Sequence, residues 1–196
     1  VTFIYDSLSE INLELKSIKS SFLIKEGKTQ EVWQALIEEF DVKKVFFNKD
    51  YEPYAIQRDE AICQLLDNNN IISYSFKDQV IFEEKEITKA DGLPYTVYTP
   101  YKNKWLEKFH QLKPFREYDT TELYGNFYKS NFDFPSLEQI GFVRSSIVVK
   151  PYTLHNLVNY QDTRDFPAVD ATSYLSPHLR FGTVSIRKIV NFAVKT

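Results

Sequence analysis

The 196-residue sequence predicts an α/β fold: a Rossmann-like open parallel sheet with helices on both faces, followed by a long connector and a helical region. Three observations support this fold class. Short β-rich runs alternate with amphipathic helical patterns over residues 1–76, an aromatic and irregular stretch follows, and helical patterns return after Pro151. Hydrophobic residues make up 43% and aromatic residues 16% of the chain, which excludes a disordered protein.

The first 76 residues repeat helix and strand three times. Apolar residues spaced by four and three predict a first helix, on the face formed by Ile4, Leu8, Ile11, Leu15 and Ile18. The runs SFLIKEG (21–27), VKKVFFN (42–48) and IISYSF (71–76) predict strands, and the patterns over 32–40 and 54–67 predict the helices between them. A strand, a helix and a strand within about thirty residues form a βαβ unit, so we expect parallel strands with right-handed crossovers.

The series opens on a helix with no strand before it, and the sequence contains no Met. A helix at this place in an open sheet normally returns from an earlier strand, so we expect that the chain is a fragment of a larger protein. We divide it into an α/β domain (1–110), an interdomain connector (111–150) and the beginning of a helical domain (151–196). Pro151 suits a helix start with Leu154, Leu157 and Val158 facing inward, and Ser185 suits the N-cap of a last helix.

Composition excludes several classes of function. No stretch has the roughly 20 uncharged apolar residues of a membrane span, and residues 1–12 lack a signal pattern. One cysteine, Cys63, and three scattered histidines exclude a disulfide framework and predict no metal site. We therefore expect a soluble, cytoplasmic protein. Residues 1–100 hold 11 basic and 18 acidic side chains, whereas residues 101–196 hold 13 and 9, which makes the second half the better partner for an anion.

A dense run of hydroxyl groups, Thr172, Ser173 and Ser176, precedes a short apolar helical segment. Hydroxyls beside unsatisfied backbone N–H groups favour an anion such as a phosphate, although an ordinary N-cap would use the same residues. Three arginines could grip a phosphate or form surface salt bridges instead: Arg164, Arg180 and Arg187.

Other polar side chains favour a structural reading. Cys63 lies on the apolar face of its predicted helix and is expected in the core. His178 is expected to be structural, and Glu83, Glu84 and Glu86 are expected to form a solvated strand end.

The block NYQDTRDFPAVDATSYLSPHLRFG resembles the flavin signature of the DNA photolyase and cryptochrome family. The signature is a Tyr, an Arg-Asp pair, a Pro, a Thr-Ser-x-Leu-Ser run and a Gly, and its positions here are Tyr160, Arg164, Asp165, Pro167, Thr172, Ser173, Leu175, Ser176, Gly182 and Ser185. The segment NKDYEPYAIQRD (48–59) is similar to the family's loop and helix after a strand, and the resemblance covers essentially the whole chain. Its Thr-Ser-Tyr-Leu-Ser run looks closer to the photolyases of cyclobutane dimers, class I, than to the (6-4) photolyases.

The resemblance implies light-dependent repair of DNA that contains pyrimidine dimers. In the family, fully reduced flavin adenine dinucleotide (FAD) passes an electron to a dimer flipped out of the duplex, the dimer splits, and the electron returns. It also implies that residues 151–196 begin an all-α FAD-binding domain, and that the full-length protein is a monomer with no membrane partner. By this resemblance Arg164 contacts a DNA phosphate, and the cofactor-binding residues are Tyr160, Thr172, Ser173, Tyr174, Leu175 and Ser176.

Two departures limit what the resemblance implies. Tyr54 and Ala55 stand where folate-antenna members carry Asn-Glu, so the resemblance disfavours a folate antenna and leaves open a deazaflavin, a flavin or no antenna chromophore. The only tryptophans, Trp33 and Trp105, lie outside the flavin region, and the family's other flavin contacts have no counterpart here. We therefore expect that this chain holds no catalytic residue, is itself inactive and binds FAD weakly or not at all.

Two alternatives remain open from the sequence. One is a cryptochrome, a blue-light receptor without repair activity. The other discards the resemblance and leaves a nucleotide-binding α/β domain with adenine nucleotide at the carboxyl ends of the strands near Asn48, although no Gly-rich loop supports it.

Overall fold

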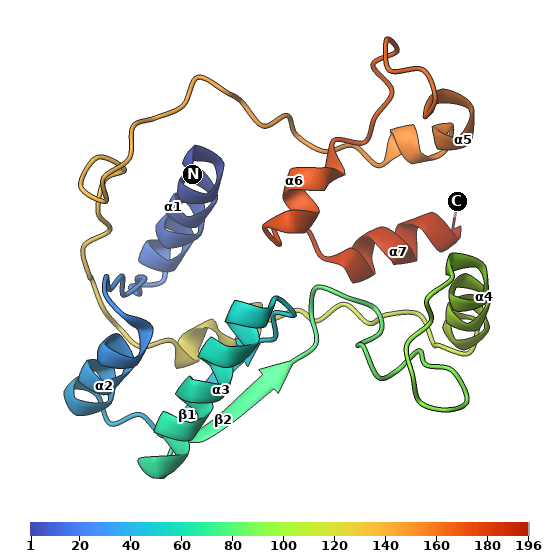
Figure 1. The fold of residues 1–196 in the computed structure, drawn as a ribbon. Helices are drawn as coiled ribbons and strands as arrows, with labels where there is room; N and C mark the ends of the chain where they lie inside the picture. Colours follow the sequence, from blue (N-terminus) through green and yellow to red (C-terminus); the bar gives the residue numbers. More distant parts are fainter. Residues whose placement is uncertain (196) are drawn as a thin grey trace. The chain divides into compact units, whose positions relative to one another are not determined.

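The computed structural model describes residues 1–195 of the chain. The chain divides into two compact units, each made from two separate stretches: Val1–Val42 with Glu117–Thr183, and Lys43–Arg116 with Val184–Thr196. The helices and strands, in chain order in Figure 1, are α1 (Thr2–Ser17), α2 (Thr29–Glu39), β1 (Lys44–Asn48), α3 (Pro53–Asn68), β2 (Ile72–Phe76), α4 (Tyr98–Phe109), the 3₁₀ helices η1 (Thr121–Asn126) and η2 (His155–Leu157), α5 (Tyr160–Thr163), α6 (Leu175–Arg180) and α7 (Ile186–Lys195).

The second unit contains a parallel sheet of β1 and β2, with Lys44 opposite Ile72 and Asn48 opposite Phe76. The helix α3 joins the two strands and packs against β2 (Figure 1). Pro53 occupies the first turn of α3, where its missing N–H costs no hydrogen bond. Five buried residues form the core of this βαβ unit: Val45, Ala55, Ile62, Leu66 and Ile71. The predicted strands over 42–48 and 71–76, the helix between them and their parallel pairing are confirmed.

The other face of this sheet carries aromatic side chains. Phe46 stacks on Tyr74 and Phe76 at centroid distances of 5.0 and 6.3 Å, and all three rings are exposed. Side chains of a strand alternate between the two faces, which is why Phe46 and Tyr74 share one face while Val45 and Ser73 meet α3.

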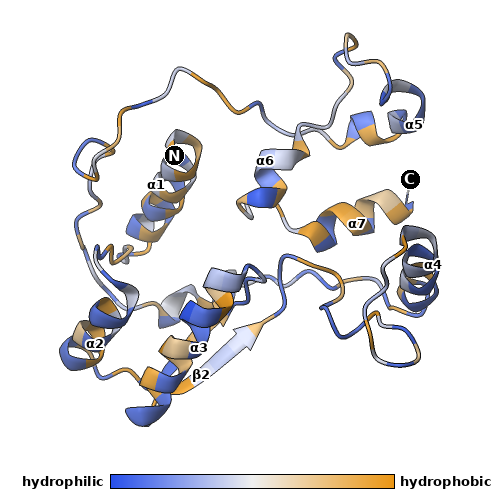
Figure 2. Ribbon diagram, viewed as in Figure 1, coloured by the Kyte–Doolittle hydropathy of each residue, from blue (hydrophilic) through white to orange (hydrophobic). Residues whose placement is uncertain are grey.

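A second core in the same unit joins α4 and α7. The buried residues Ile81, Phe82 and Ile87 pack against Tyr95, Trp105, Phe109, Phe115, Ile186 and Val190. Asn191 of α7 bonds both backbone groups of Phe115, at 2.8 and 3.1 Å. The helix α7 begins immediately after Ser185, as predicted, and is mostly hydrophobic (Figure 2).

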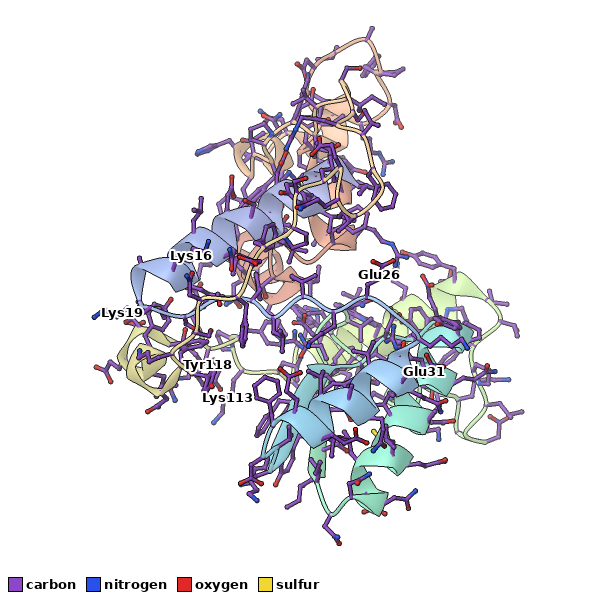
Figure 3. The ribbon with its side chains drawn as sticks, turned by 90° about the vertical axis from the view of Figure 1, so that its left-hand side faces the viewer. Lys16, Lys19, Glu26, Glu31, Lys113 and Tyr118 are labelled. Atoms are coloured by element: carbon purple, nitrogen blue, oxygen red, sulfur yellow. The ribbon has the colours of Figure 1, made fainter. Side chains whose placement is uncertain are left out.

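In the first unit, the segment after Glu117 packs on α1. Arg144 forms two hydrogen bonds with Asp6, at 2.8 and 2.9 Å, and the Tyr5 hydroxyl donates to the carbonyl of Pro135 at 3.2 Å. Lys16 and Lys19 lie at the C-terminal end of α1 (Figure 3), where positive charge is favourable beside the last carbonyls. The predicted first helix is therefore confirmed and is held by residues far along the chain.

The strand predicted over 21–27 is wrong. These residues are extended but have no partner strand within the described chain, because other groups bond to this stretch. The N–H of Phe22 donates to the amide oxygen of Asn12 at 3.0 Å, and the hydroxyl of Ser21 accepts from Phe132 N–H at 2.8 Å. Asn12 is buried in the middle of α1, at a position that the apolar pattern does not include.

The helix predicted to start at Pro151 is also wrong. The N–H of Thr153 donates to the carbonyl of Ser173 at 3.0 Å, which holds this stretch extended, and helical structure begins only at His155. Val158 is exposed rather than inward-facing. No helix in the described chain is long and apolar enough to cross a membrane.

Candidate functional site

The hydroxyl-rich segment Thr172–Ser176 turns sharply into α6. Tyr174 has φ 54° and ψ 19°, in the left-handed region that side chains other than Gly rarely adopt. The carbonyl of Ser173 accepts from Thr153 N–H at 3.0 Å, and the carbonyl of Thr172 accepts from the Asn156 amide at 2.9 Å. Leu175 is buried below the turn. The backbone of the segment is thus fixed at several points.

The hydroxyl groups of this segment do not cap α6. No side-chain cap bond is formed at the start of the helix, although an ordinary N-cap was the simpler interpretation of the sequence. Thr172 and Ser176 are exposed, and Ser173 is half-buried. Within residues 1–195 these three hydroxyls have no hydrogen-bond partner, so they are available to a ligand.

Tyr174 is held by two charged side chains outside the hydroxyl run. Lys150 Nζ donates to the Tyr174 hydroxyl at 2.8 Å, and that hydroxyl donates to Asp170. The hydrogen bonds to Tyr174 and Asp170 raise the pKa of Lys150, and those from Tyr174 and Lys150 lower the pKa of Asp170, so both groups are charged at neutral pH. We call these three residues the tyrosine clamp.

His178 has the structural role expected of it. Its Nε2 bonds the carbonyl of Lys150 at 3.0 Å, and its Nδ1 bonds the Thr183 hydroxyl at 2.8 Å. A carbonyl only accepts, so Nε2 donates to it, and the Thr183 hydroxyl can serve Nδ1 either as donor or as acceptor. The rings of Phe3 and Tyr152 pack edge-on against the imidazole at 5.2 and 5.1 Å.

The other predicted contacts lie on the surface of the first unit. Tyr160 is the first residue of α5 and is exposed. Arg164 follows the same helix, and its side chain lies 3.7 Å from the carboxylate of Asp165. This is the neighbouring ion pair that the sequence offered as the alternative to phosphate binding, although more than half of each side chain remains accessible.

Arg187 belongs to a different part of the structure. Its guanidinium donates to the carbonyls of Asp78, Lys77 and Val80 at 2.8, 3.1 and 3.3 Å and lies 3.6 Å from the Asp78 carboxylate. The guanidinium therefore anchors α7 to the loop after β2. The salt bridge that the sequence offered as one interpretation is present with Asp78, but the sequence pattern did not indicate the three carbonyls of the loop after β2.

A cavity of about 470 Å³ lies at the carboxyl ends of β1 and β2, beside α3. Lys49 reaches Glu83 at 3.0 Å, and the Tyr51 hydroxyl donates to the same carboxylate at 3.3 Å. Glu86 accepts from Lys77 at 2.5 Å. The interpretation of Glu83, Glu84 and Glu86 as a solvated strand end is wrong for Glu83 and Glu86, because both are half-buried and each pairs with a lysine, Lys49 or Lys77.

Cys63 is half-buried on α3, lines this cavity and accepts a long bond of 3.5 Å from the Ser73 hydroxyl. It is therefore less enclosed than the core position expected of it. No three described His, Cys, Asp or Glu side chains converge as metal ligands would.

Sequence reasoning missed the tyrosine clamp and the walls of this cavity. Asp170 and Tyr174 have the i, i+4 spacing of neighbouring side chains, which is a weak signal, but Lys150 has no local signal at all. The location of the cavity was foreseeable from the rule that ligands bind outside the carboxyl ends of parallel strands.

The sequence model of the DNA photolyase family matches residues 1–119, and the chain belongs to this family. Deoxyribodipyrimidine photo-lyases of Halobacterium salinarum and Synechococcus sp. are 28% and 26% identical over 98% and 96% of this chain. The chain spans only 43% and 42% of the length of those two proteins.

Solved photolyase structures have the same fold. A bacterial class III photolyase from Agrobacterium tumefaciens superposes with a TM-score of 0.76 at 22% identity, covering 97% of this chain and 43% of that one. An archaeal photolyase from Sulfolobus tokodaii, described with two FAD molecules, superposes with a TM-score of 0.69 at 23% identity, covering 100% of this chain and 44% of that one. The predicted α/β, Rossmann-like fold class is confirmed.

Proposed function

We propose that the protein to which this chain belongs is a deoxyribodipyrimidine photolyase, which splits cyclobutane pyrimidine dimers in DNA under blue light. The observation that carries the proposal is the segment Thr172–Ser176 in a chain of the photolyase family. Its backbone is fixed by bonds to Thr153 and Asn156, while its hydroxyls make no cap bond. A rigid turn with available donors suits a ligand that carries phosphate and hydroxyl groups, and FAD is such a ligand.

In this proposal the residues of this chain help the full-length protein to bind and orient FAD and do not react themselves. Thr172, Ser173 and Ser176 donate to the phosphate and ribitol region, Tyr160 contacts the same part of the cofactor, and Tyr174 and Leu175 shape the turn between the donors. Reduced FAD supplies the electron that opens the dimer.

Arg164 is the proposed contact to DNA. Its guanidinium is about half exposed and its pairing with Asp165 is loose, at 3.7 Å, so a phosphate can replace that carboxylate without loss of a buried interaction. The wider DNA surface, the monomeric state and the lesion class are part of the proposal for the full-length protein.

The test is repair by the product of the full reading frame. An oligonucleotide with one cyclobutane thymine dimer is incubated with reduced protein in blue light and in the dark, and restored thymines are counted by chromatography. We expect repair only in light. Flavin photoreduction without repair would instead favour a cryptochrome-type receptor. Absence of both bound flavin and repair would refute the proposal.

Two variants assign the residues. The double variant Thr172→Val, Ser176→Ala is expected to lower FAD retention on purification at least tenfold, while Ser17→Ala, which removes an exposed hydroxyl from α1, leaves it unchanged. Arg164→Gln is expected to weaken binding of the damaged DNA several-fold with FAD content unchanged. Arg58→Gln is its control, since Arg58 also pairs with the following aspartate.

A further inference from the structure

The tyrosine clamp joins three places in the sequence of the first unit. Lys150 belongs to the segment before η2, Asp170 lies in the loop between α5 and α6, and Tyr174 directly precedes α6 (Figure 1). The Lys150 ammonium lies 2.8 Å from the Tyr174 hydroxyl, 3.4 Å from the Asp170 carboxylate and 4.5 Å from the centre of the tyrosine ring. The hydroxyl accepts from Lys150 and donates to Asp170, so both of its hydrogen-bonding functions are used.

The two charged members of the clamp are held by bonds that do not involve the tyrosine. Nε2 of the buried His178 donates to the carbonyl of Lys150 at 3.0 Å, which ties Lys150 to α6. The N–H of Ala171 donates to the carbonyl of Val169 at 2.8 Å and closes a tight turn centred on Asp170. The backbone at both charged residues is therefore fixed independently of the tyrosine.

The clamp is too exposed to stabilise the whole fold. The side chains of Lys150 and Asp170 are 57% and 69% exposed. Ion pairs this exposed are screened by water and lose side-chain entropy on pairing, so they add little to the free energy of unfolding. A local effect on Tyr174 explains the arrangement better, because a tyrosine backbone at φ 54° persists only where its surroundings support it.

The left-handed conformation of Tyr174 does not come from the end of a helix. Within residues 1–195, the other residues besides glycine with positive φ are Lys19, at 62°, and Asn70, at 56°. Each follows the C-cap of a helix, α1 or α3, where the left-handed conformation is common. Tyr174 instead precedes a helix, so contacts of its side chain are needed to hold this backbone, and the clamp supplies them.

The backbone at Tyr174 sets the relative positions of the hydroxyls in the run. Ser173 lies directly before the tyrosine, and Ser176 follows two residues after it. The carbonyl of Ser173 is held by the N–H of Thr153 at 3.0 Å, and Leu175 is buried, so the chain is anchored on both sides of the tyrosine. A change of φ to the right-handed region would break one of these anchors or turn Ser176 away from Ser173.

We propose that Lys150 and Asp170 are positioning residues of the FAD site. Through the hydroxyl of Tyr174 they hold the turn in the conformation in which the hydroxyl run binds the cofactor. They do not touch the cofactor themselves, and their opposite charges balance each other at 3.4 Å. The inference rests on the proposed function, because the cofactor is the one proposed there.

The test measures FAD affinity in the product of the full reading frame, by titrating the flavin-free protein with FAD and following the quenching of flavin fluorescence. Tyr174→Phe keeps the ring and removes both hydrogen bonds of the hydroxyl. We expect it to weaken FAD binding about tenfold, because the cost of a left-handed aromatic residue is then no longer offset and the binding-competent turn is less populated. Lys150→Met with Asp170→Ala should have the same effect, and the urea midpoint should stay unchanged in both variants.

Two controls remove the same kinds of group elsewhere in the first unit. Tyr128→Phe removes the hydroxyl of a tyrosine that is 70% exposed. Lys28→Met with Glu31→Ala removes an exposed ion pair at the start of α2, whose charged atoms lie 3.2 Å apart. Neither change should alter FAD affinity, since both lie outside the clamp and the hydroxyl run.

The variant Tyr174→Gly separates positioning from direct contact with the cofactor. Glycine adopts the left-handed conformation without support from a side chain. In the Tyr174→Gly background, removal of Lys150 and Asp170 should therefore lower FAD affinity by less than about twofold, against about tenfold when the tyrosine is present. If Lys150 were bound to a phosphate of FAD, its removal would lower the affinity equally in both backgrounds.

Three results would overturn the inference: an unchanged FAD affinity in Tyr174→Phe, an equal loss on removal of Lys150 and Asp170 in the two backgrounds, or a urea midpoint that falls together with the affinity. The proposed function fails in a different way. A parent protein that binds no FAD would overturn both proposals. A parent that binds FAD and repairs dimers, with clamp variants that keep its FAD affinity, would overturn this inference alone.

Discussion

Replacement of Arg187 by Met tests whether this arginine is an anchor of the fold. The guanidinium donates to three carbonyls at 2.8, 3.1 and 3.3 Å, and its side chain is 25% exposed. Hydrogen bonds to a charged group contribute about 1.5–3 kcal/mol each when buried, and the longest bond and the partial exposure reduce their sum. We expect Arg187→Met to lower the free energy of unfolding by about 2–3 kcal/mol. Met keeps the aliphatic stem beside Phe115, so most of the packing is retained.

The measurement is urea unfolding of the whole chain, followed by tryptophan fluorescence in a Trp33→Phe background. Trp105 packs in the second core on Phe82 and Phe109, and it then reports the unit that Arg187 holds together. With a urea dependence of about 1–3 kcal/mol per molar for small domains, the expected loss moves the midpoint down by roughly 1 M. Arg187→Lys should recover part of the loss, because an ammonium reaches one or two of the three carbonyls but not all of them.

Arg164→Met is the matched control. Arg164 is more than half exposed and pairs loosely with its neighbour, so its removal should move the midpoint very little. A urea midpoint for Arg187→Met within roughly 0.2 M of the parent's midpoint would refute the claim that Arg187 anchors the fold. Arg187 would then be available to an anionic ligand, as one interpretation of the sequence had it.

Three further changes have distinct expected results. Leu66 is fully buried, so Leu66→Ala should cost about 3–4 kcal/mol in the same urea assay, and Leu65→Ala, at a half-buried neighbour, should cost clearly less. Tyr174→Gly and Tyr174→Ala both remove the tyrosine ring, but only Gly adopts the left-handed backbone freely. The Gly variant should therefore be more stable than the Ala variant by about 1 kcal/mol. Equal urea midpoints for the two variants would contradict this. Burial raises the pKa of Glu86, but the bonds from Lys77 and the Glu83 N–H outweigh it and lower the pKa below 4.5. The stabilisation by Glu86 is therefore complete above pH 4.5 and is lost as the pH falls through its folded-state pKa, so the gap between the parent and Glu86→Gln should close in acid; a constant gap from pH 7 to pH 3 would count against it.

The elements that the sequence predicted correctly are those with a repeating apolar pattern. The helix over 54–67 and the strands on either side of it follow their patterns because α3 buries Ala55, Ile62 and Leu66 on the sheet. The strand over 21–27 has the same kind of composition. It failed because the buried side chain of Asn12 bonds to its backbone, and a pattern of apolar residues contains no information about such a polar contact.

In the candidate site, too, some residues are visible as a sequence pattern and others depend on partners that the sequence does not indicate. Three hydroxyls within five residues are visible in the sequence, and the structure leaves them available as that pattern suggested. Arg187 was misread because its partners are backbone carbonyls 107 to 110 residues away, which have no residue type to recognise. Glu83 was misread for a similar reason, since Lys49 follows β1 and meets Glu83 only after the two strands are paired.

Tyr174 lies within the hydroxyl run that the sequence pattern shows, and it is held by contacts that only the structure shows. A tyrosine at φ 54° carries a conformational cost of about 1–2 kcal/mol that an exposed turn would normally relieve by changing its backbone. Such strain persists only where the surroundings determine the conformation, and here the hydroxyl of Tyr174 bonds Lys150 on one side and Asp170 on the other. Because Tyr174 lies between Ser173 and Ser176, its backbone conformation sets the directions in which those hydroxyls point. The geometry of the hydroxyl run is therefore determined by two charged residues outside it, and a sequence that kept the run but lost Lys150 and Asp170 would present its donors differently.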